Sequence, residues 1–458
     1  MTPLRIRHML GRWLAGARSE KESVASTRIE PLTQSSDPAG RMSEPVLPTP
    51  PWPQVPEPAS LRDRLAAVLL FSTYPSDPRP RRAAEALVRE GMRVEIVCLR
   101  NDPNEPSRER IGGVDILRLP LQHHRGNKLG YIFRYLLFIV WSGLILAFRC
   151  LTRRYDLVHV HNMPDILVFS ALVPRLLGAS VILDLHDPMP ELMSTIFKAG
   201  AESRSVRILK RLECWSIGFA DSAVTVNRAC QKIFAARSCS ASKLHIVMNS
   251  PDEQAFGFLP AIQGRRLTGS SPFVIMYHGS VIHRHGLDLA VEALRQVRGT
   301  VPGAVLRIYG RRTPFLDEVL HSVKDTELAP AVQYLGARDV EGIAAAIDEC
   351  DVGIIPNRRS VFTELNTPTR IFEYLARGKP VVAPRAPGIE DYFSERQIIF
   401  FELGNAEELA RKIEFVAAAP QDVVETVRRG QEVYLAHTWT EERRKLLDLV
   451  KGLVVARR

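Results

Sequence analysis

Residues 370–382 read RIFEYLARGKPVV, the pattern of an amphipathic helix joined to a buried strand through Gly378. Arg370 lies in the first turn of this helix, where unpaired N–H groups and the helix dipole favour an anion such as a diphosphate. Glu373 follows one turn later, and its carboxylate can accept hydrogen bonds from hydroxyl groups. The pair therefore suits a ligand with phosphate at one end and ribose at the other. An ordinary surface ion pair on a core helix is the alternative.

On either side of this stretch, the C-terminal half of the chain alternates apolar strands with helices. The expected strands are 273–277, 305–309, 332–335, 352–355, 381–383 and 398–401. Continuous apolar strands separated by helices predict a parallel sheet that is covered on both faces. We expect this domain to span residues 273–437. A last helix over 438–458 is expected to begin at a capping box formed by Thr438 and Glu441.

The N-terminal half shows the same alternation over residues 61–250. Its expected strands are 66–72, 93–99, 114–119, 156–161, 181–186, 223–226 and 244–247. Residues 251–272 turn to Pro, Gly, Ser and Gln without periodicity, which predicts an interdomain linker. The chain is therefore predicted to have an α/β fold with two doubly wound, Rossmann-like domains. Such domains place a ligand in the cleft between the carboxyl ends of their strands.

Composition limits the class of protein. With 458 residues, 45% of them hydrophobic and 24% charged, the chain can bury a large core divided between two or three domains. The six cysteines are scattered without a close pair, which argues against a zinc site or a disulfide framework and indicates a reducing compartment such as the cytosol. Residues 1–60 are basic and Pro-rich, contain no continuous apolar run of the signal-peptide kind, and are expected to be disordered.

The net charge of +10 favours an anionic partner, but no nucleic-acid motif accompanies it, so an anionic membrane surface is the better candidate. Residues 135–148 read YLLFIVWSGLILAF between Arg134 and Arg149, inside a helix expected over 129–152. This apolar stretch is shorter than the roughly 20 residues that span a bilayer. It fits either a buried crossover helix or a helix half-inserted at the membrane interface, with its arginines on lipid phosphate.

Three further loops carry candidate site residues. After the strand 273–277, Gly279 lets the backbone approach an anion and Arg284 supplies charge, as does Arg370 on the facing loop. An ordinary strand-to-helix turn is the alternative. The loop with Arg79, Arg81 and Arg82 follows the first strand and faces the same cleft. It could bind an acceptor phosphate or be a solvated surface.

The third loop contains His186 and Asp187, which follow a buried strand and are expected to line the cleft. A strand-end histidine bonded to backbone is the alternative for His186. His161, at the end of the preceding strand, is expected to line the same cleft. With Asp184 and Glu191 these residues could bind a divalent ion, but the chain has no Asp-x-Asp sequence, so we predict no metal.

Three segments resemble the signatures of retaining family 4 of the GT-B glycosyltransferases, particularly members that build bacterial exopolysaccharide and lipopolysaccharide. They are YDLVHVHNMPDILVFSALVPRLLGASVILDLHDPMPEL (155–192), HGSVIHRHGLDLAVEAL (278–294) and NTPTRIFEYLARGKPVVAP (366–384). The resemblance covers roughly residues 65 to 450. It implies an N-terminal acceptor-binding domain and a C-terminal domain that binds a nucleotide sugar.

The resemblance also implies roles for single residues. Glu373 matches the second glutamate of the family's Glu-x7-Glu motif, which bonds to the nucleotide ribose. The first would fall at Leu365, so Glu364, one residue out of register, or Asn366 or Thr367 is expected to contact the donor sugar.

Two cationic positions of the family are altered here. Ser280 stands near its phosphate-binding arginine and His285 at its lysine, which leaves Arg284 and Arg370 as the expected cations. His186 matches the histidine that reaches the donor sugar.

The function implied is transfer of a sugar, with retention, from a nucleoside diphosphate sugar to a lipid-linked or saccharide acceptor, with no cofactor beyond the donor. UDP is the expected nucleotide because it is common in the family. The resemblance places the enzyme at the cytoplasmic face of the inner membrane. Two rivals share the fold: a sugar-nucleotide 2-epimerase, and a non-catalytic scaffold of a polysaccharide assembly complex.

Overall fold

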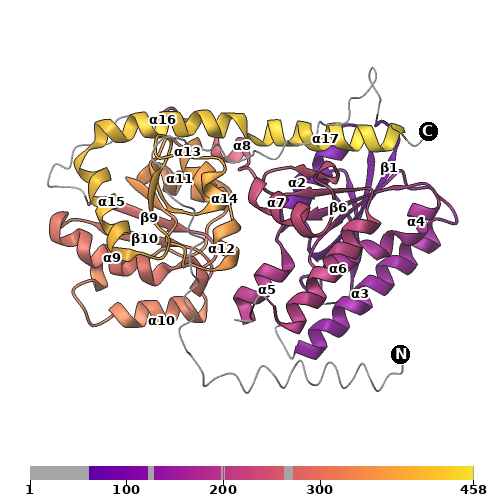
Figure 1. Ribbon diagram of the computed structural model, residues 1–458, viewed down its shortest axis with the longest axis horizontal. Helices are drawn as coiled ribbons and strands as arrows, with labels where there is room; N and C mark the ends of the chain where they lie inside the picture. Colours follow the sequence, from indigo (N-terminus) through magenta and orange to yellow (C-terminus); the bar gives the residue numbers. More distant parts are fainter. Residues whose placement is uncertain (1–60, 122–127, 198–199, 201, 262–271, 457–458) are drawn as a thin grey trace, which may run out of the picture.

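The computed structural model describes residues 61–121, 128–197, 200, 202–261 and 272–456. The predicted tail, residues 1–60, and residues 262–271 of the predicted linker lie outside the described residues. Two α/β domains stand side by side, and a pair of long C-terminal helices runs along both of them (Figure 1).

The N-terminal domain is built on an eight-stranded sheet of order β3-β4-β2-β1-β5-β6-β7-β8. Every pairing in it is parallel except that between β3 and β4. The charged edge strand β3 was not predicted, because its sequence RERI lacks an apolar pattern. The strands are β1 (Leu65–Thr73), β2 (Arg93–Leu99), β3 (Arg108–Ile111), β4 (Val114–Leu119), β5 (Leu157–His161), β6 (Ser180–Leu185), β7 (Ser222–Thr225) and β8 (Leu244–Ile246).

Helices cover both faces of this sheet, and apolar side chains pack beneath them in two clusters. The helices are α2 (Pro78–Arg89), α3 (Lys128–Arg149), η2 (Asp165–Ala171), α4 (Leu172–Leu176), α5 (Met189–Phe197), α6 (Arg204–Phe219), α7 (Arg228–Arg237) and η3 (Ala241–Lys243). Within the expected linker, α8 (Glu253–Phe256) forms, and its Phe256 is buried in the core of the C-terminal domain.

The C-terminal domain has a six-stranded, wholly parallel sheet of order β11-β10-β9-β12-β13-β14. Its strands are β9 (Val274–His278), β10 (Val305–Tyr309), β11 (Val332–Tyr334), β12 (Val352–Ile354), β13 (Val381–Arg385) and β14 (Ile399–Glu402). The elements between and after them are η4 (His283–His285), α9 (Leu287–Thr300), α10 (Pro314–Val323), η5 (Ala329–Ala331), α11 (Val340–Glu349), α12 (Val361–Leu365), α13 (Thr369–Ala376), α14 (Pro387–Glu390) and α15 (Ala406–Ala418).

The C-terminal helices join the two domains. Helix α16 (Pro420–Ala436) packs on the C-terminal domain, and α17 (Trp439–Ala456) crosses back and packs against α2 (Figure 1). The apolar face of α17 is buried in the same cluster as the central strands of the N-terminal sheet; it comprises Leu446, Leu447, Leu449, Val450 and Val454. The last helix of the chain is thus part of the core of the first domain.

Helix α3 is largely exposed, unlike the buried crossover helix that was one of its two predicted forms. It has 22 residues, and only 17% of its most apolar window, Ile132–Arg149, is buried, although that window has a mean hydropathy of 1.7. By length and composition it is the one helix among the described residues that could cross a membrane. The alternative of a buried crossover helix is therefore wrong, because η2, α4 and β1 cover only one side of α3.

A buried carboxylate fixes α17 to the interdomain segment. Glu442 is fully buried; it accepts hydrogen bonds from the Met248 N–H (2.7 Å) and the Lys445 ammonium (2.7 Å), and its other contact is the His437 ring (2.9 Å). Burial alone would raise the pKa of Glu442, but these three partners hold it below its ordinary value of 4.5. The carboxylate is therefore ionised in the folded protein at neutral pH.

We expect Glu442→Ala to lower the free energy of unfolding by about 3 kcal/mol at pH 7, because it leaves buried donors without their charged partner. Since the folded pKa is depressed, the contribution of Glu442 is present above pH 4.5, and the two proteins should converge in stability as the pH falls below that value. Urea denaturation measures both effects. The exposed Glu432→Ala on α16 is the control and should change stability by less than about 1 kcal/mol.

Candidate active site

The carboxyl end of β9 and the start of α13 meet at Arg370. Its Nη1 donates a hydrogen bond to the His278 carbonyl (2.6 Å), and its guanidinium lies 5.3 Å from the centre of the Tyr277 ring. Gly279 has a φ of +112°, and a Cβ there would lie 3.4 Å from Cδ of Arg370. A glycine at 279 therefore leaves room for the arginine to lie directly over the loop, where the sequence predicts an anion.

Glu373 lies one turn further along α13, with Oε2 3.4 Å from Nε2 of the buried His278. Burial raises the pKa of Glu373 to about 7, against the opposing effect of Arg370 and Arg82. Burial and the charge of Arg370 lower the pKa of His278 well below its ordinary value, so this histidine is neutral. The structure thus holds Glu373 in a water-poor position next to the guanidinium of Arg370.

Arg284 and Asp187 come from opposite domains, and their charges interact electrostatically. Burial raises the pKa of Asp187 to about 6, and Arg284 and Arg79 act in the opposite direction. The guanidinium of Arg284 lies 5.3 Å from the centre of the Phe362 ring, and its Nε is buried without a hydrogen-bond partner among the described residues. A buried, unpaired N–H on a cation is costly, so Arg284 is well suited to receive an anionic ligand.

The loop between Arg284 and β9 holds its own shape. The His285 Nδ1 and the Tyr277 hydroxyl both donate to the Ser280 carbonyl, at 2.8 Å each. Burial, reinforced by Arg370, lowers the pKa of His285 to about 3. His285 is thus a neutral group that orders the loop and does not supply the positive charge of the lysine whose position it occupies.

Three residues before α13 were expected to take the place of the first motif glutamate, and their side chains have different surroundings. Glu364 forms a surface ion pair with Arg359 (3.0 Å). Thr367 donates from Oγ1 to the Gly388 carbonyl (2.5 Å) and accepts from Nδ2 of Asn227 in the other domain (3.0 Å). Asn366 is half-buried at the end of α12. The side chains of Glu364 and Thr367 are therefore engaged within the protein, and a sugar contact of Asn366 stays a prediction.

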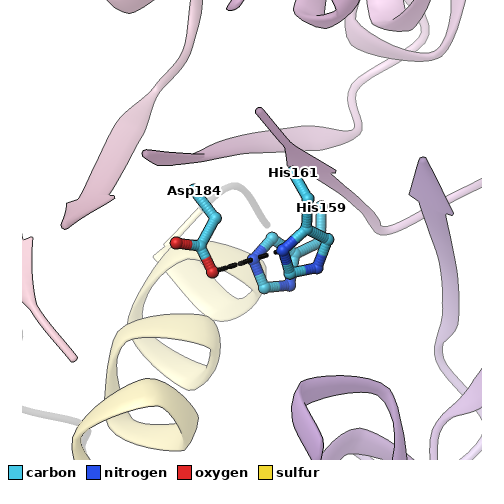
Figure 2. A group of neighbouring side chains, drawn as sticks. All are labelled: His159, His161 and Asp184. Atoms are coloured by element: carbon cyan, nitrogen blue, oxygen red, sulfur yellow. Dashed lines mark ion pairs between the residues drawn. The ribbon is translucent and has the colours of Figure 1, made fainter. Parts of the chain in front are cut away.

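On the N-terminal side, His159, His161 and Asp184 form a buried polar cluster (Figure 2). His186 lies against this cluster. Nδ1 of His161 is 2.9 Å from Nε2 of His186, and Nδ1 of His161 and Nε2 of His159 lie 3.4 and 3.5 Å from Oδ2 of Asp184. Arg79 binds Asp184 through two nitrogens, with a shortest distance of 2.7 Å. The cluster is therefore an ion pair surrounded by three histidines.

The charges in this cluster decide the state of the histidines. Although burial alone would raise the pKa of Asp184, Arg79 and the histidines hold it well below its ordinary value. Burial lowers the pKa of His161 well below its ordinary value and that of His186 to about 4. Because Nε2 of the neutral His186 ring is already in contact with His161, Nδ1 is the ring nitrogen left to hydrogen-bond a hydroxyl group.

The same cluster is a poor metal site, although His159, His161 and Asp184 lie close enough together to hold an ion. The guanidinium of Arg79 already occupies the Asp184 carboxylate and would repel a divalent cation. Glu191, another metal candidate, is bound by Arg237 at 2.5 and 2.9 Å. The prediction that the protein needs no metal stays a prediction.

Arg79 and Arg82 bind other parts of the protein, which the sequence did not indicate. Besides binding Asp184, Arg79 donates to the Val247 carbonyl (2.9 Å). Arg82 donates to the Ser250 carbonyl and the Asn249 side chain, and its guanidinium lies 5.0 Å from the centre of the Trp439 ring. Both guanidinium groups thus bind the segment between the domains; Arg79 is buried, whereas Arg82 is partly buried and also interacts electrostatically with Glu373. Their role toward an acceptor phosphate stays a prediction.

Two asparagines with structural roles at the site were missed. Asn162 Oδ1 accepts from the His186 N–H (2.8 Å), and its Nδ2 donates to Asp165 and to the Asp187 carbonyl, at 3.0 Å each. Asn227 donates to the Leu365 carbonyl across the domain interface (2.8 Å). The position of Asn162 immediately after His161 was the signal available for the first, whereas nothing local marked the second.

We expect Arg79→Met to lower the free energy of unfolding by about 3–5 kcal/mol, because Asp184 would remain as a buried, unpaired charge. Adding Asp184→Asn should recover part of this loss, since the charge is then removed. Urea denaturation measures both. Arg81→Met, which removes an exposed pair with Glu85, is the control and should cost less than about 1 kcal/mol. Equal losses at positions 79 and 81 would contradict the assignment.

Comparisons with known proteins agree with this architecture. Residues 76–250 match the family described as "Glycosyl transferase 4-like domain", and residues 272–418 match "Glycosyl transferases group 1". Together the two matches cover more than two thirds of the chain. Glycogen synthase of Mycobacterium tuberculosis is 23% identical over 192 residues, which are 42% of this chain and 43% of the relative. The match therefore spans less than half the length of this curated relative.

Solved structures show the same fold. Sucrose-phosphate synthase from Thermosynechococcus elongatus aligns with a TM-score of 0.69 at 18% identity, over 86% of this chain and 100% of that one. Anabaena HepE in complex with UDP-glucose aligns at 0.62 and 15%, over 84% and 98%. An E. coli trehalose-6-phosphate structure bound with UDP-2-fluoro glucose aligns at 0.62 and 12%, over 84% and 99%. The predicted fold of two doubly wound domains in the GT-B arrangement is thereby confirmed.

Proposed function

Because the chain belongs to the GT-B glycosyltransferases, we propose that it transfers a sugar from a UDP-sugar to a lipid-linked or saccharide acceptor in cell-surface polysaccharide biosynthesis. The observation that carries the proposal is the electrostatic interaction between Arg284 of one domain and Asp187 of the other, with Arg370 and Glu373 on the Arg284 side and His186 next to Asp187 in the chain. The neighbours solved with UDP-glucose and UDP-2-fluoro glucose support uridine as the base. The two-domain fold suits a cytoplasmic enzyme working at the membrane face.

The donor would bind with its ribose on Glu373 and its diphosphate on the N-terminus of α13 and the loop after β9. Ionised Glu373 accepts hydrogen bonds from both ribose hydroxyls, which a neutral acid does less well. Arg370 lies directly against Gly279, where a Cβ would come within 3.4 Å of the arginine Cδ. Peptide N–H groups at the start of α13 add the favourable end of the helix dipole.

The chemistry is a problem of leaving-group charge. As the bond between sugar and phosphate breaks, negative charge grows on the diphosphate, and fixed cations next to it lower the barrier by several kcal/mol. Arg284 and Arg370 supply this charge from opposite sides of the loop after β9. For retention, the acceptor hydroxyl attacks from the leaving-group side, and a phosphate oxygen can take its proton. The reaction then requires no carboxylate nucleophile.

His186 would orient hydroxyl groups of the donor sugar. Its Nε2 is in contact with His161, and its backbone N–H is bonded to Asn162, so both the ring and the loop are fixed. Asp187 lies beside it and opposite Arg284, where domain closure would bring them together over the diphosphate. Closure also excludes the water that would otherwise hydrolyse the donor.

Arg284→Ala should weaken UDP binding at least tenfold, since a charge-assisted hydrogen bond to phosphate contributes about 1.5–3 kcal/mol. Isothermal titration calorimetry measures the effect. Arg312→Ala removes an exposed arginine that is paired with Asp317 and should leave UDP affinity unchanged. An unchanged affinity in Arg284→Ala would remove this residue from the phosphate site.

The pKa of Glu373, raised to about 7, predicts a pH dependence of donor binding. Glu373 is mostly neutral at pH 6 and mostly ionised at pH 8. UDP-glucose should therefore bind about ten times more tightly at pH 8 than at pH 6. The UDP-glucose diphosphate does not titrate in this range. Calorimetry on wild type and Glu373→Gln tests this, and the variant should bind weakly and show no rise in affinity between pH 6 and 8, since Asp187, with a pKa of about 6, can only weaken anion binding as it ionises. A flat wild-type profile would contradict the role of Glu373.

The proposed reaction is tested by incubating the protein with UDP-, GDP- and ADP-sugars and a membrane extract as acceptor, then following nucleotide release and the sugar by NMR. Release of UDP with sugar attached to extract lipid or saccharide supports the proposal. Conversion of the donor to its 2-epimer would establish the epimerase instead. A ligand at a hundred times its dissociation constant adds about 2.7 kcal/mol of stability. A folded protein that no nucleotide stabilises would be a scaffold.

A further inference from the structure

One side of the N-terminal domain exposes a continuous apolar stripe on α3. Phe133, Leu136, Val140, Leu144 and Phe148 recur every three or four residues and so share one face of the helix, with exposed fractions between 50% and 74%. Between Arg134 and Arg149 the helix carries no charged residue. Monomeric soluble proteins rarely expose a patch of this kind without a partner.

The opposite side of α3 belongs to the protein core. Phe138, Ser142 and Leu146 are buried, and Ser142 Oγ donates to the Phe138 carbonyl (2.6 Å) and lies 3.1 Å from Oγ of Ser170 in η2. Gly143 lets the two segments approach, since a Cβ there would lie 3.5 Å from the backbone of Ser170. At about 1.5 Å per residue, 22 residues could cross a bilayer. A helix held along one side in this way cannot leave the domain to do so.

Helix α6 continues the same surface. The short helix η2 packs against both α3 and α6, which run side by side in Figure 1. Phe169 of η2 contacts Phe219 of α6, with ring centres 5.2 Å apart. Leu172 and Leu176 of the following α4 are exposed between them. The apolar surface therefore extends beyond the stretch that the sequence marks.

The outer face of α6 is basic. Arg204, Arg207 and Arg211 are exposed at helical spacing, on the same face as the exposed Ile208 and Trp215. The one acid of α6, Glu213, is buried and bound by Arg237 (2.6 Å). A ridge of apolar side chains next to a row of arginines and a tryptophan has the chemistry of an interfacial membrane helix.

We propose that α3, η2–α4 and α6 form a single docking face for an anionic lipid bilayer, with the α3 stripe in the acyl boundary and the α6 arginines on lipid phosphates. Charge selects this occupant over a second copy of the chain. A two-fold contact through this face would bring the arginines of one α6 towards those of another, whereas an anionic leaflet neutralises them. This face is defined without reference to nucleotide binding.

The face has a consequence for the acceptor, which rests on the proposed function. Helix α5 packs against α6 on one side and against α12 of the other domain on the other. Its last residues, Ile196 and Phe197, are exposed and apolar. The docking face therefore continues along α5 towards the cleft between the domains. An acceptor anchored in the same leaflet could reach His186 without leaving the membrane.

Co-sedimentation of the full-length protein with vesicles tests the docking face. Vesicles of phosphatidylcholine with 30% phosphatidylglycerol should bind the protein, and neutral vesicles should bind it more weakly. Arg204→Ser, Arg207→Ser and Arg211→Ser together should reduce anionic binding about a hundredfold, at about fivefold for each charge near the surface. Leu136→Ser with Leu144→Ser should reduce binding to both kinds of vesicle. All these positions are exposed, so the variants should fold.

The control removes the same charge elsewhere, with Arg295→Ser, Arg428→Ser and Arg429→Ser on the C-terminal domain. Anionic binding that is equally weak in both triple variants, or unchanged in both, would overturn the docking face. So would a dimer by light scattering that the leucine variant dissociates, because the face would then be a self-interface. UDP-glucose calorimetry on the same proteins separates the two proposals: vesicle binding without nucleotide binding would refute only the proposed function.

Discussion

The buried ion pair between Arg79 and Asp184 is the interaction on which the arrangement of the site depends. Asp184 belongs to β6, whose end carries His186, and Arg79 belongs to the first turn of α2. The same guanidinium binds the Val247 carbonyl, at the start of the segment that leads to the second domain. The Arg79 guanidinium therefore fixes α2, β6 and the segment that leads from the first domain to the second. Because all three partners are buried, none of these bonds can be exchanged for water without a large cost.

Side chains of three helices also bind residues 248–250, which lie in the segment between the two domains. Arg82 binds the Ser250 carbonyl and Asn249, while Thr369 of α13 donates to the Asn249 carbonyl (2.9 Å). Glu442 binds Met248 from the side of α17. Thus α2, α13 and α17 all hold the same few residues. A change in the angle between the domains must pass through this segment, so the donor site proposed at α13 is mechanically linked to the position of α2.

The strands were predictable because buried parallel strands are continuous apolar runs, and β2, β4 and β10 have the bounds expected from sequence. The edge strand β3 and the exposed state of α3 were not, since the first lacks that pattern and burial of an apolar helix depends on what packs over it. At the candidate site, the sequence singled out Arg370, Glu373 and Gly279 from local motifs, and the structure brings Arg370 against Gly279 and Glu373 close to His278. The sequence could not assign Arg79 to Asp184, 105 residues away, because pairing of distant charges is set by the tertiary fold alone.

The charges at the cleft are arranged so that an anion completes them. Burial raises the pKa of both Glu373 and Asp187 and lowers that of Arg284, so each of these groups is held in conditions that disfavour its charged form. The neighbouring histidines His278, His285 and His186 are neutral and add no charge. A diphosphate between Arg284 and Arg370 would stabilise the cations by direct contact, while the ribose would hydrogen-bond the carboxylate of Glu373. On the proposed function, the donor would supply partners for these buried groups, and closure of the domains would follow its binding.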